Sequence, residues 1–219
     1  MSARRAPTTN RRTPIPRRTP KPRRKKAVVV ALTAAVLVGP GVAQATPQTA
    51  PASQERVAAA DIAWTLERAS NPTADQRTAY DLITKAMNAA VARYNNLSDL
   101  GRAITVRYDP GVPTADGNIN GTIRFGNRGY MTERTALHEI AHTIGVGTSS
   151  RWSSLAGSGT WTGSQATALV KQFDGSSTAK LSTGGGHFWP YGLNYENEFS
   201  STAADRHVRI VAAMVRDGL

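Results

Sequence analysis

Apolar residues recur at helical spacing between residues 74 and 95, and this pattern predicts one long amphipathic helix. Polar residues and alanines occupy most of the remaining positions of the segment. An Asn-Pro-Thr sequence at residues 71–73 provides a turn and an N-cap in front of it. We expect the apolar side of this helix to be core, and it consists of Tyr80, Ile83, Met87, Val91 and Tyr94.

A second pattern, the alternation of apolar and polar residues, predicts two short strands. Ile104, Val106 and Tyr108 alternate with polar residues in the first strand, and residues 122–125 form the second. Asp-Gly-Asn at residues 116–118 is read as a turn between them. A half-buried sheet of this kind needs a helix on one face, so the long helix is expected to back it.

Three further helices are predicted, over about residues 132–144, 162–173 and 202–216. Thr162 with Gln165 resembles a capping box at the start of the middle one. The segments between these helices are rich in Ser, Gly and Thr and are predicted to be loops, over residues 149–160 and 174–186. The order of elements favours an α+β fold with a small antiparallel or mixed sheet.

The first 45 residues have the three parts of a secretory signal peptide. A basic stretch ends at residues 23–26, an apolar run covers residues 27–38, and Ala-Gln-Ala at residues 43–45 is a cleavage signal. The apolar run is short for a transmembrane helix, although an uncleaved anchor is the alternative. We therefore expect a secreted protein without stable membrane association after cleavage.

The remaining chain is expected to contain one domain. Residues 46–70 are expected to be a flexible leader or a propeptide remnant, and residues 71–219 the folded domain. Residues 1–26 hold 11 of the 27 Lys and Arg, which leaves 16 basic and 15 acidic residues after the cleavage signal. This near-neutral body argues against a nucleic-acid partner. The chain has no cysteine, which excludes thiol nucleophiles and Cys-type zinc sites.

His-Glu-Ile-Ala-His at residues 138–142 is the strongest chemical signal in the chain. Residues four apart lie on one face of a helix, so His138 and His142 can bind one metal ion together. Glu139 lies beside the first ligand and can take a proton from a water molecule at the metal. Two of the four histidines fall in this motif. The pattern predicts a Zn2+ site with a general base.

The motif and its surroundings resemble the zincin peptidases, and Gly145 resembles the glycine of the metzincin branch. A more particular likeness is to a group of secreted bacterial metzincin-like proteins, some of which carry a ricin-type lectin module. It rests on HExxHTxGVGT at residues 138–148, on Trp152 and on HFWPYGLNY at residues 187–195. The resemblance covers about residues 121–219 and implies a zincin-like fold, with the motif helix beneath a cleft.

The chain departs from the metzincin pattern at two points. Metzincins have a third histidine ten residues after the first, and here that position is Thr148. Metzincins also have a methionine in a turn beneath the metal, and no methionine occupies the turn at residues 190–192. The third ligand therefore has to come from another part of the chain.

Four residues are candidates for this third ligand. We select His187, because the Pro-Tyr-Gly turn that follows it at residues 190–192 could pass beneath the metal. Glu196 or Glu198 would instead imitate the glutamate zincins. His207 lies in the last helix, where apolar neighbours compete for the buried face.

The resulting hypothesis is a monomeric zinc metallopeptidase that hydrolyses a peptide or protein substrate. Tyr191 is selected as the phenol that donates a hydrogen bond to the oxyanion, and Tyr195 is near enough in sequence to line the same cleft. The edge of the strand around Ile123 is expected to be free and to pair with an extended peptide. Two alternatives stay open, namely a non-catalytic zinc module that binds glycan or peptide, and a hydrolase of cell-wall amides.

Overall fold

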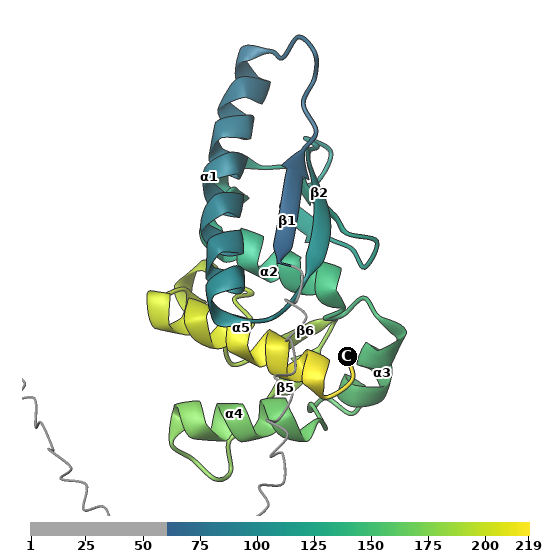
Figure 1. Ribbon diagram of the computed structural model, residues 1–219, viewed down its shortest axis with the longest axis vertical. Coiled ribbons are helices and arrows are strands. Elements are labelled where there is room, and N and C mark those ends of the chain that lie inside the picture. The colour runs from purple at the N-terminus through teal and green to yellow at the C-terminus, as the bar shows by residue number, and fades with distance from the viewer. Residues whose placement is uncertain (1–60) are drawn as a thin grey trace, which may run out of the picture. The chain divides into compact units, whose positions relative to one another are not determined.

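The computed structural model describes residues 61–219 of the chain (Figure 1). The predicted signal peptide and residues 46–60 lie outside the described residues. Strand β1 (Ile62–Leu66) lies inside the segment that the sequence assigns to a leader. The predicted domain boundary at residue 71 is therefore wrong, because Ile62 is buried in the core of the domain. Within residues 61–219, no helix has the length and apolar character needed to cross a membrane.

The fold is α+β with a small mixed sheet of four strands in the order β1-β2-β4-β3. Strands β2 (Arg102–Tyr108) and β4 (Thr122–Phe125) confirm the two predicted strands. Strands β1, β2 and β4 run parallel, and β3 (Ala115–Gly117) is antiparallel to β4. Ile123 lies on β4, which has a neighbour on each side, so the prediction of a free edge there is wrong. The edge strands of this sheet are β1 and β3.

Helix α1 (Ala74–Leu97) covers one face of the sheet, as predicted (Figure 1). Thr73 closes a capping box with Gln76 at its start, which satisfies two backbone N–H groups. The predicted apolar side packs inward, with Tyr80, Ile83, Met87 and Tyr94 buried and Val91 at the edge of the core. Helix α1 also packs against α2 (Glu133–Ile144) and α5 (Ser201–Arg216).

The segment between α2 and α5 contains one longer helix, α4 (Ser164–Asp174), and several short elements. Two of them fall in predicted loops: α3 (Ser150–Ala156) and β5 (Ser182–Gly184). Strand β5 forms a hairpin with β6 (His187–Trp189). A short 3-10 helix, η2 (Glu196–Glu198), precedes α5, and another, η1 (Arg128–Tyr130), precedes α2.

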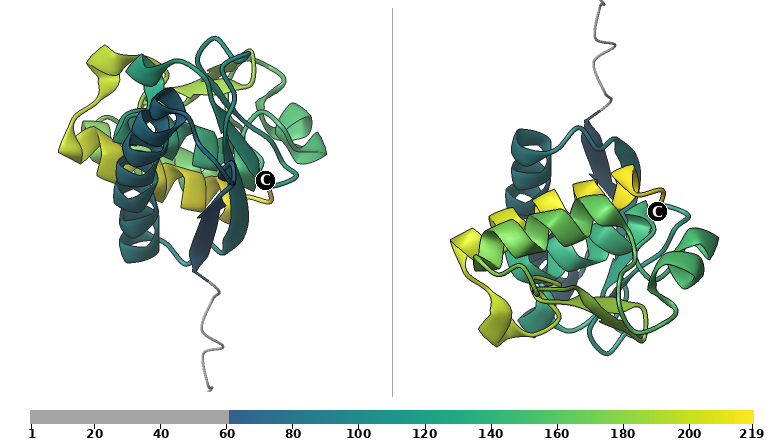
Figure 2. Two further views of the ribbon diagram at one scale, coloured as in Figure 1. Left: turned by 90° about the horizontal axis from the view of Figure 1, so that it is seen from above. Right: turned by 90° about the horizontal axis from the view of Figure 1, so that it is seen from below.

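Helix α4 (Ser164–Asp174) begins later than the capping box predicts. Its N-cap is Gly163, which offers no side chain, and the carboxylate of Asp217 accepts from the N–H groups of Gln165 and Ala166 instead. A partner from the far end of the chain therefore replaces the local cap. Helices α4 and α5 lie side by side in Figures 1 and 2.

Candidate metal centre

Helix α2 presents His138 and His142 on one face. Thr132 caps its first turn, accepting from Thr135 N–H, and Gly145 ends it with φ of 132°, a backbone angle that favours glycine. The Nε2 atoms of the two histidines lie 3.1 Å apart. The helical spacing of the motif therefore brings two nitrogens to one point, as predicted from the sequence.

Backbone carbonyls fix the orientation of both rings. The Nδ1 atom of His138 lies 2.8 Å from the carbonyl oxygen of Gly192, and that of His142 lies 2.7 Å from the carbonyl oxygen of Val146. A carbonyl can only accept, so each Nδ1 carries the hydrogen and each Nε2 keeps its lone pair. Burial lowers the pKa of both histidines, that of His138 well below its usual range, which favours these neutral rings.

His187 completes a group of three. It lies on β6, and its ring centroid is 5.2 Å from that of His138 and 5.3 Å from that of His142. One ligand atom from each of the three residues lies within 4.8 Å of the others. This group could hold a metal ion, and the structure brings His187 to the helical pair, as the sequence predicts.

Glycines let the hairpin come this close to α2. At Gly147, φ is 69°, and a Cβ atom built there would lie 2.2 Å from the carbonyl oxygen of Gly186. Any larger residue would push the two backbones apart. Because Gly186 directly precedes His187, the close approach at Gly147 sets the position of the third imidazole.

The other three candidates for the third ligand lie elsewhere. His207 is fully buried, and both of its ring nitrogens face backbone carbonyls. The carboxylate of Glu196 binds Arg134 at 2.9 Å. The carboxylate of Glu198 accepts from the N–H of Asn194 at 2.7 Å. None of the three belongs to the metal-binding group found among residues 61–219.

Glu139 lines the cleft beside the three histidines and is 6% exposed. Burial raises its pKa to about 8, and the negative charge of Asp116 acts in the same direction, while Arg134 and the Gly117 N–H oppose it. A positive ion held by the histidines would also favour the ionised carboxylate. The side chain is therefore able to exchange a proton in the neutral pH range.

The cleft has a volume of about 440 Å³ and is bounded on one side by strand β3. Thr148, ten residues after His138, lines it and donates to the carbonyl oxygen of His142 at 2.6 Å. Tyr130 and Tyr195 line it as well and are among the few exposed large hydrophobic residues of residues 61–219, at 37% and 63% exposure.

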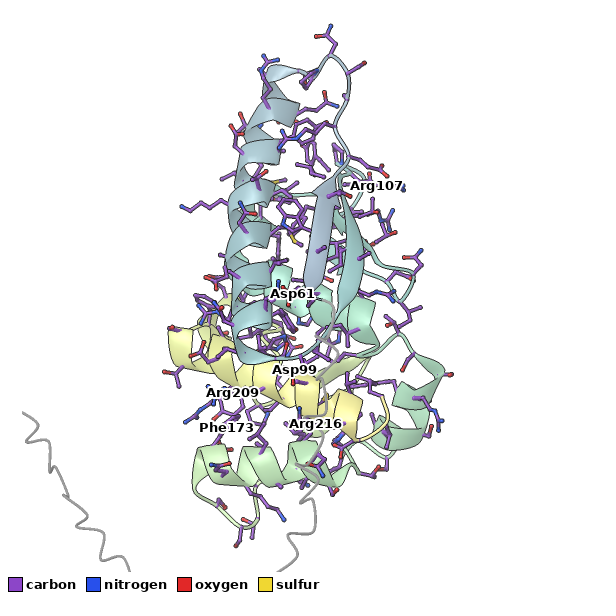
Figure 3. The ribbon with its side chains drawn as sticks, viewed as in Figure 1. Asp61, Asp99, Arg107, Phe173, Arg209 and Arg216 are labelled. Carbon is purple, nitrogen blue, oxygen red and sulfur yellow. The ribbon has the colours of Figure 1, made fainter. Side chains whose placement is uncertain are left out.

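Tyr191, selected from the sequence as the catalytic phenol, is not in this cleft. Its hydroxyl donates to Asp174 at 2.5 Å and accepts from Arg206, and its ring packs edge-on against Phe173. Phe173 projects from α4 towards α5 in Figure 3, so this contact lies beside these two helices. The selection of Tyr191 is wrong because the turn points its side chain away, and Tyr195 is the tyrosine of that segment that reaches the cleft.

Sequence reasoning missed Asp116 and Gly117. It treated them as a turn, whereas they form part of edge strand β3. A Cβ atom at Gly117 would lie 2.3 Å from the carbonyl oxygen of Glu139, so the glycine allows the strand to touch α2. The sequence offered one signal, since Asp116 and Arg124 have opposite charges and flank a polar turn. In the structure these two residues are directly paired across the hairpin.

Comparisons of the chain with protein-family models, with curated protein sequences and with solved structures give no match. The functional assignment therefore depends on the chemistry of the site.

Proposed function

We propose that the chain is a secreted, zinc-dependent peptide hydrolase with a zincin-like fold. The observation that carries the proposal is the set of three imidazoles whose nitrogens converge beside a buried glutamate. Three protein ligands and one open position are typical of catalytic zinc sites, and neutral histidine nitrogens suit this metal. Zinc supplies a Lewis acid that polarises a carbonyl group and acidifies a bound water molecule.

The distances are compatible with this ion. Two nitrogens that each lie about 2.0–2.1 Å from one zinc are about 3.3 Å apart at a tetrahedral angle. The Nε2 atoms of His138 and His142 are 3.1 Å apart, and with hydrogens on both Nδ1 atoms their lone pairs face one another. Such a pair is repulsive unless a proton or a cation lies between the nitrogens, and burial disfavours the proton.

The chain's own residues supply the remaining steps. Glu139, adjacent to the first ligand, takes the proton of the attacking water and delivers it to the leaving amine. Tyr195 replaces Tyr191 as the phenol that can donate to the oxyanion. The free edge of β3 bounds the cleft, so its backbone can pair with an extended peptide. We propose that the enzyme acts on peptides as a monomer.

The decisive experiment is Glu139→Gln in purified protein that holds one zinc. The amide keeps the size of the side chain but cannot take a proton, so kcat/KM on a peptide library should fall at least about 100-fold with the zinc content unchanged. Glu133→Gln is the matched control, because it makes the same change on the same helix but pairs with Arg93.

Three outcomes count against the proposal. Equal rates for the two variants would exclude Glu139 as the base. A protein that binds zinc but cleaves no peptide would support a non-catalytic zinc module. Cleavage of cell-wall amides alone would move the assignment to that substrate class.

A further inference from the structure

His207 touches sequence neighbours of two of the three ligands and of the carbonyl that orients one of them. From α5, its Nδ1 lies 2.8 Å from the carbonyl oxygen of Tyr191, and its Nε2 lies 3.1 Å from that of Leu137. Its ring stacks on Phe188, with the centroids 5.8 Å apart.

Each of the three contacted residues is adjacent in the sequence to a residue of the metal site. Leu137 precedes the ligand His138, Phe188 follows the ligand His187, and Tyr191 precedes Gly192, whose carbonyl orients His138. One fully buried side chain on α5 therefore joins two segments that are far apart in the sequence, α2 and residues 188–191.

The contacts define where the hydrogen of His207 lies. A neutral imidazole has one N–H, so it can donate to only one of the two carbonyls. The hydroxyl of Tyr94 lies 3.1 Å from Nε2 and can donate to it. With the hydrogen on Nδ1, the ring donates to the nearer of the two carbonyls, that of Tyr191. Nε2 can then accept from Tyr94, whose hydroxyl also lies 3.2 Å from the carbonyl oxygen of Leu137. Burial lowers the pKa of His207 to about 4, which keeps the ring neutral.

The turn that His207 holds needs anchors. Tyr191 and Leu193 have positive φ angles of 66° and 57°, which residues other than glycine adopt rarely and at a free-energy cost. Such a conformation persists where contacts from outside the turn hold it. One contact is the guanidinium of Arg134, which donates to the carbonyl oxygen of Leu193 at 2.8 Å, and the other is His207. Gly192, between them, carries the carbonyl that orients His138.

We propose that His207, with its hydrogen on Nδ1, is a positioning residue of the metal site that holds the 191–193 turn against α2, and so keeps the Gly192 carbonyl on Nδ1 of His138. It acts through this contact, since its own nitrogens face the two carbonyls and Tyr94. The inference depends on the metal site and does not require the protein to be a peptidase.

The test measures zinc affinity of the full chain by competition with a chelator, for three substitutions of His207. His207→Leu fills the space without donating and should weaken zinc binding by at least about tenfold, the scale on which partners that orient a ligand act. His207→Asn places an amide N–H near the position of Nδ1, and should stay within about threefold of the original protein. His207→Gln places its amide near Nε2 instead, and should lose about as much affinity as the leucine variant.

Two further readouts separate positioning from ordinary stability. Val211→Ala, one turn along α5 and also fully buried, is the control for loss of packing alone, and should lower the melting temperature while zinc affinity stays unchanged. With Co2+ as the probe, His207→Leu should change the visible absorption of the bound ion, whereas Val211→Ala should not. Nitrogen-15 NMR should place the hydrogen of His207 on Nδ1.

The proposal is overturned if His207→Leu binds zinc as the original protein does, or if Val211→Ala weakens binding equally. Should the leucine variant fail to fold, the Asn and Gln variants decide, since equal affinities for these two would exclude a specific contact with Tyr191. Peptidase activity enters none of these measurements, so a protein without it could still support the positioning role.

Discussion

The two halves of the described chain achieve order by different means. From residue 61 to 144 the chain forms strands and two helices whose apolar residues recur regularly and pack into one core. From residue 145 to 199 it forms helix α4 and several shorter elements, joined by loops in which several glycines have positive φ. Yet this second half supplies the third histidine, both carbonyls that orient the first two, and the cleft tyrosine.

The difference indicates that stability and metal binding are largely separable in this protein. Buried apolar area in the first half supplies much of the folding free energy. The second half also adds apolar residues to the core, Trp161, Leu181 and Phe188 among them, and in addition it brings the groups that surround the metal site to α2. Substitutions in the two halves should therefore affect different measurements, and the following predictions test that separation.

The largest effect is expected for His187→Ala. Removal of a ligand should reduce zinc affinity by more than the roughly 10–100-fold that loss of a partner of a ligand causes. The stability of the metal-free protein should change little, because His187 is only partly buried. Glu196→Ala is the control, and zinc titration of both proteins is the measurement. Zinc loss in the control but not in His187→Ala would transfer the ligand role to the glutamate.

The opposite result is expected for Ile83→Ala in the first half. Ile83 is fully buried on α1, so its truncation should reduce the free energy of unfolding by about 2–5 kcal/mol. The folded fraction should bind zinc with unchanged affinity, since α1 supplies no ligand. Denaturant unfolding and zinc titration measure the two quantities. A parallel loss of affinity would contradict the separation of the halves.

Much of the first half could be predicted from the sequence, for local physical reasons. The α1 helix has its own cap at Thr73 and a regular apolar side, and α2 has Thr132 and Gly145 at its ends. Such signals lie within a few residues of the structure that they determine. Strand β1 was missed because it has five residues and one neighbouring strand, so little in its sequence distinguishes it from a leader.

The structure of the second half depends on contacts between residues that are far apart in the sequence. Asp217 caps α4 from about 50 residues away, where the local Thr162 signal was misleading. The direction of Tyr191 depends on the backbone of a turn anchored by His207. His187 could be selected because few donors remained once the motif was recognised, which is an argument from chemistry and needs no knowledge of the path of the chain.

Acid should destabilise the metal-free protein through His207. Its pKa is about 4 in the folded protein and about 6.5 in the unfolded chain, so folding favours the neutral ring. This contribution is complete above pH 6.5 and is lost as the pH falls towards 4, a difference of about 3 kcal/mol. The comparison of the original protein with His207→Leu by denaturant unfolding between pH 7.5 and 4 isolates it, because all other titrating groups are common to both. If the free energies of unfolding of the two proteins changed in parallel with pH, the lowered pKa of His207 would be contradicted.

The smallest effect is expected for Tyr191→Phe, which removes a hydroxyl that the sequence suggests as catalytic. That hydroxyl joins Asp174 and Arg206 at the surface between α4 and α5. Its loss should reduce the free energy of unfolding by about 1 kcal/mol, as for a typical hydrogen bond. Peptidase rate and zinc affinity should not change, since the side chain lies outside the cleft. Tyr195→Phe is the matched substitution, and there kcat/KM should fall while stability is unaffected, because that ring is mostly exposed. A rate loss in Tyr191→Phe alone would restore the original assignment and show that the turn changes conformation when substrate binds.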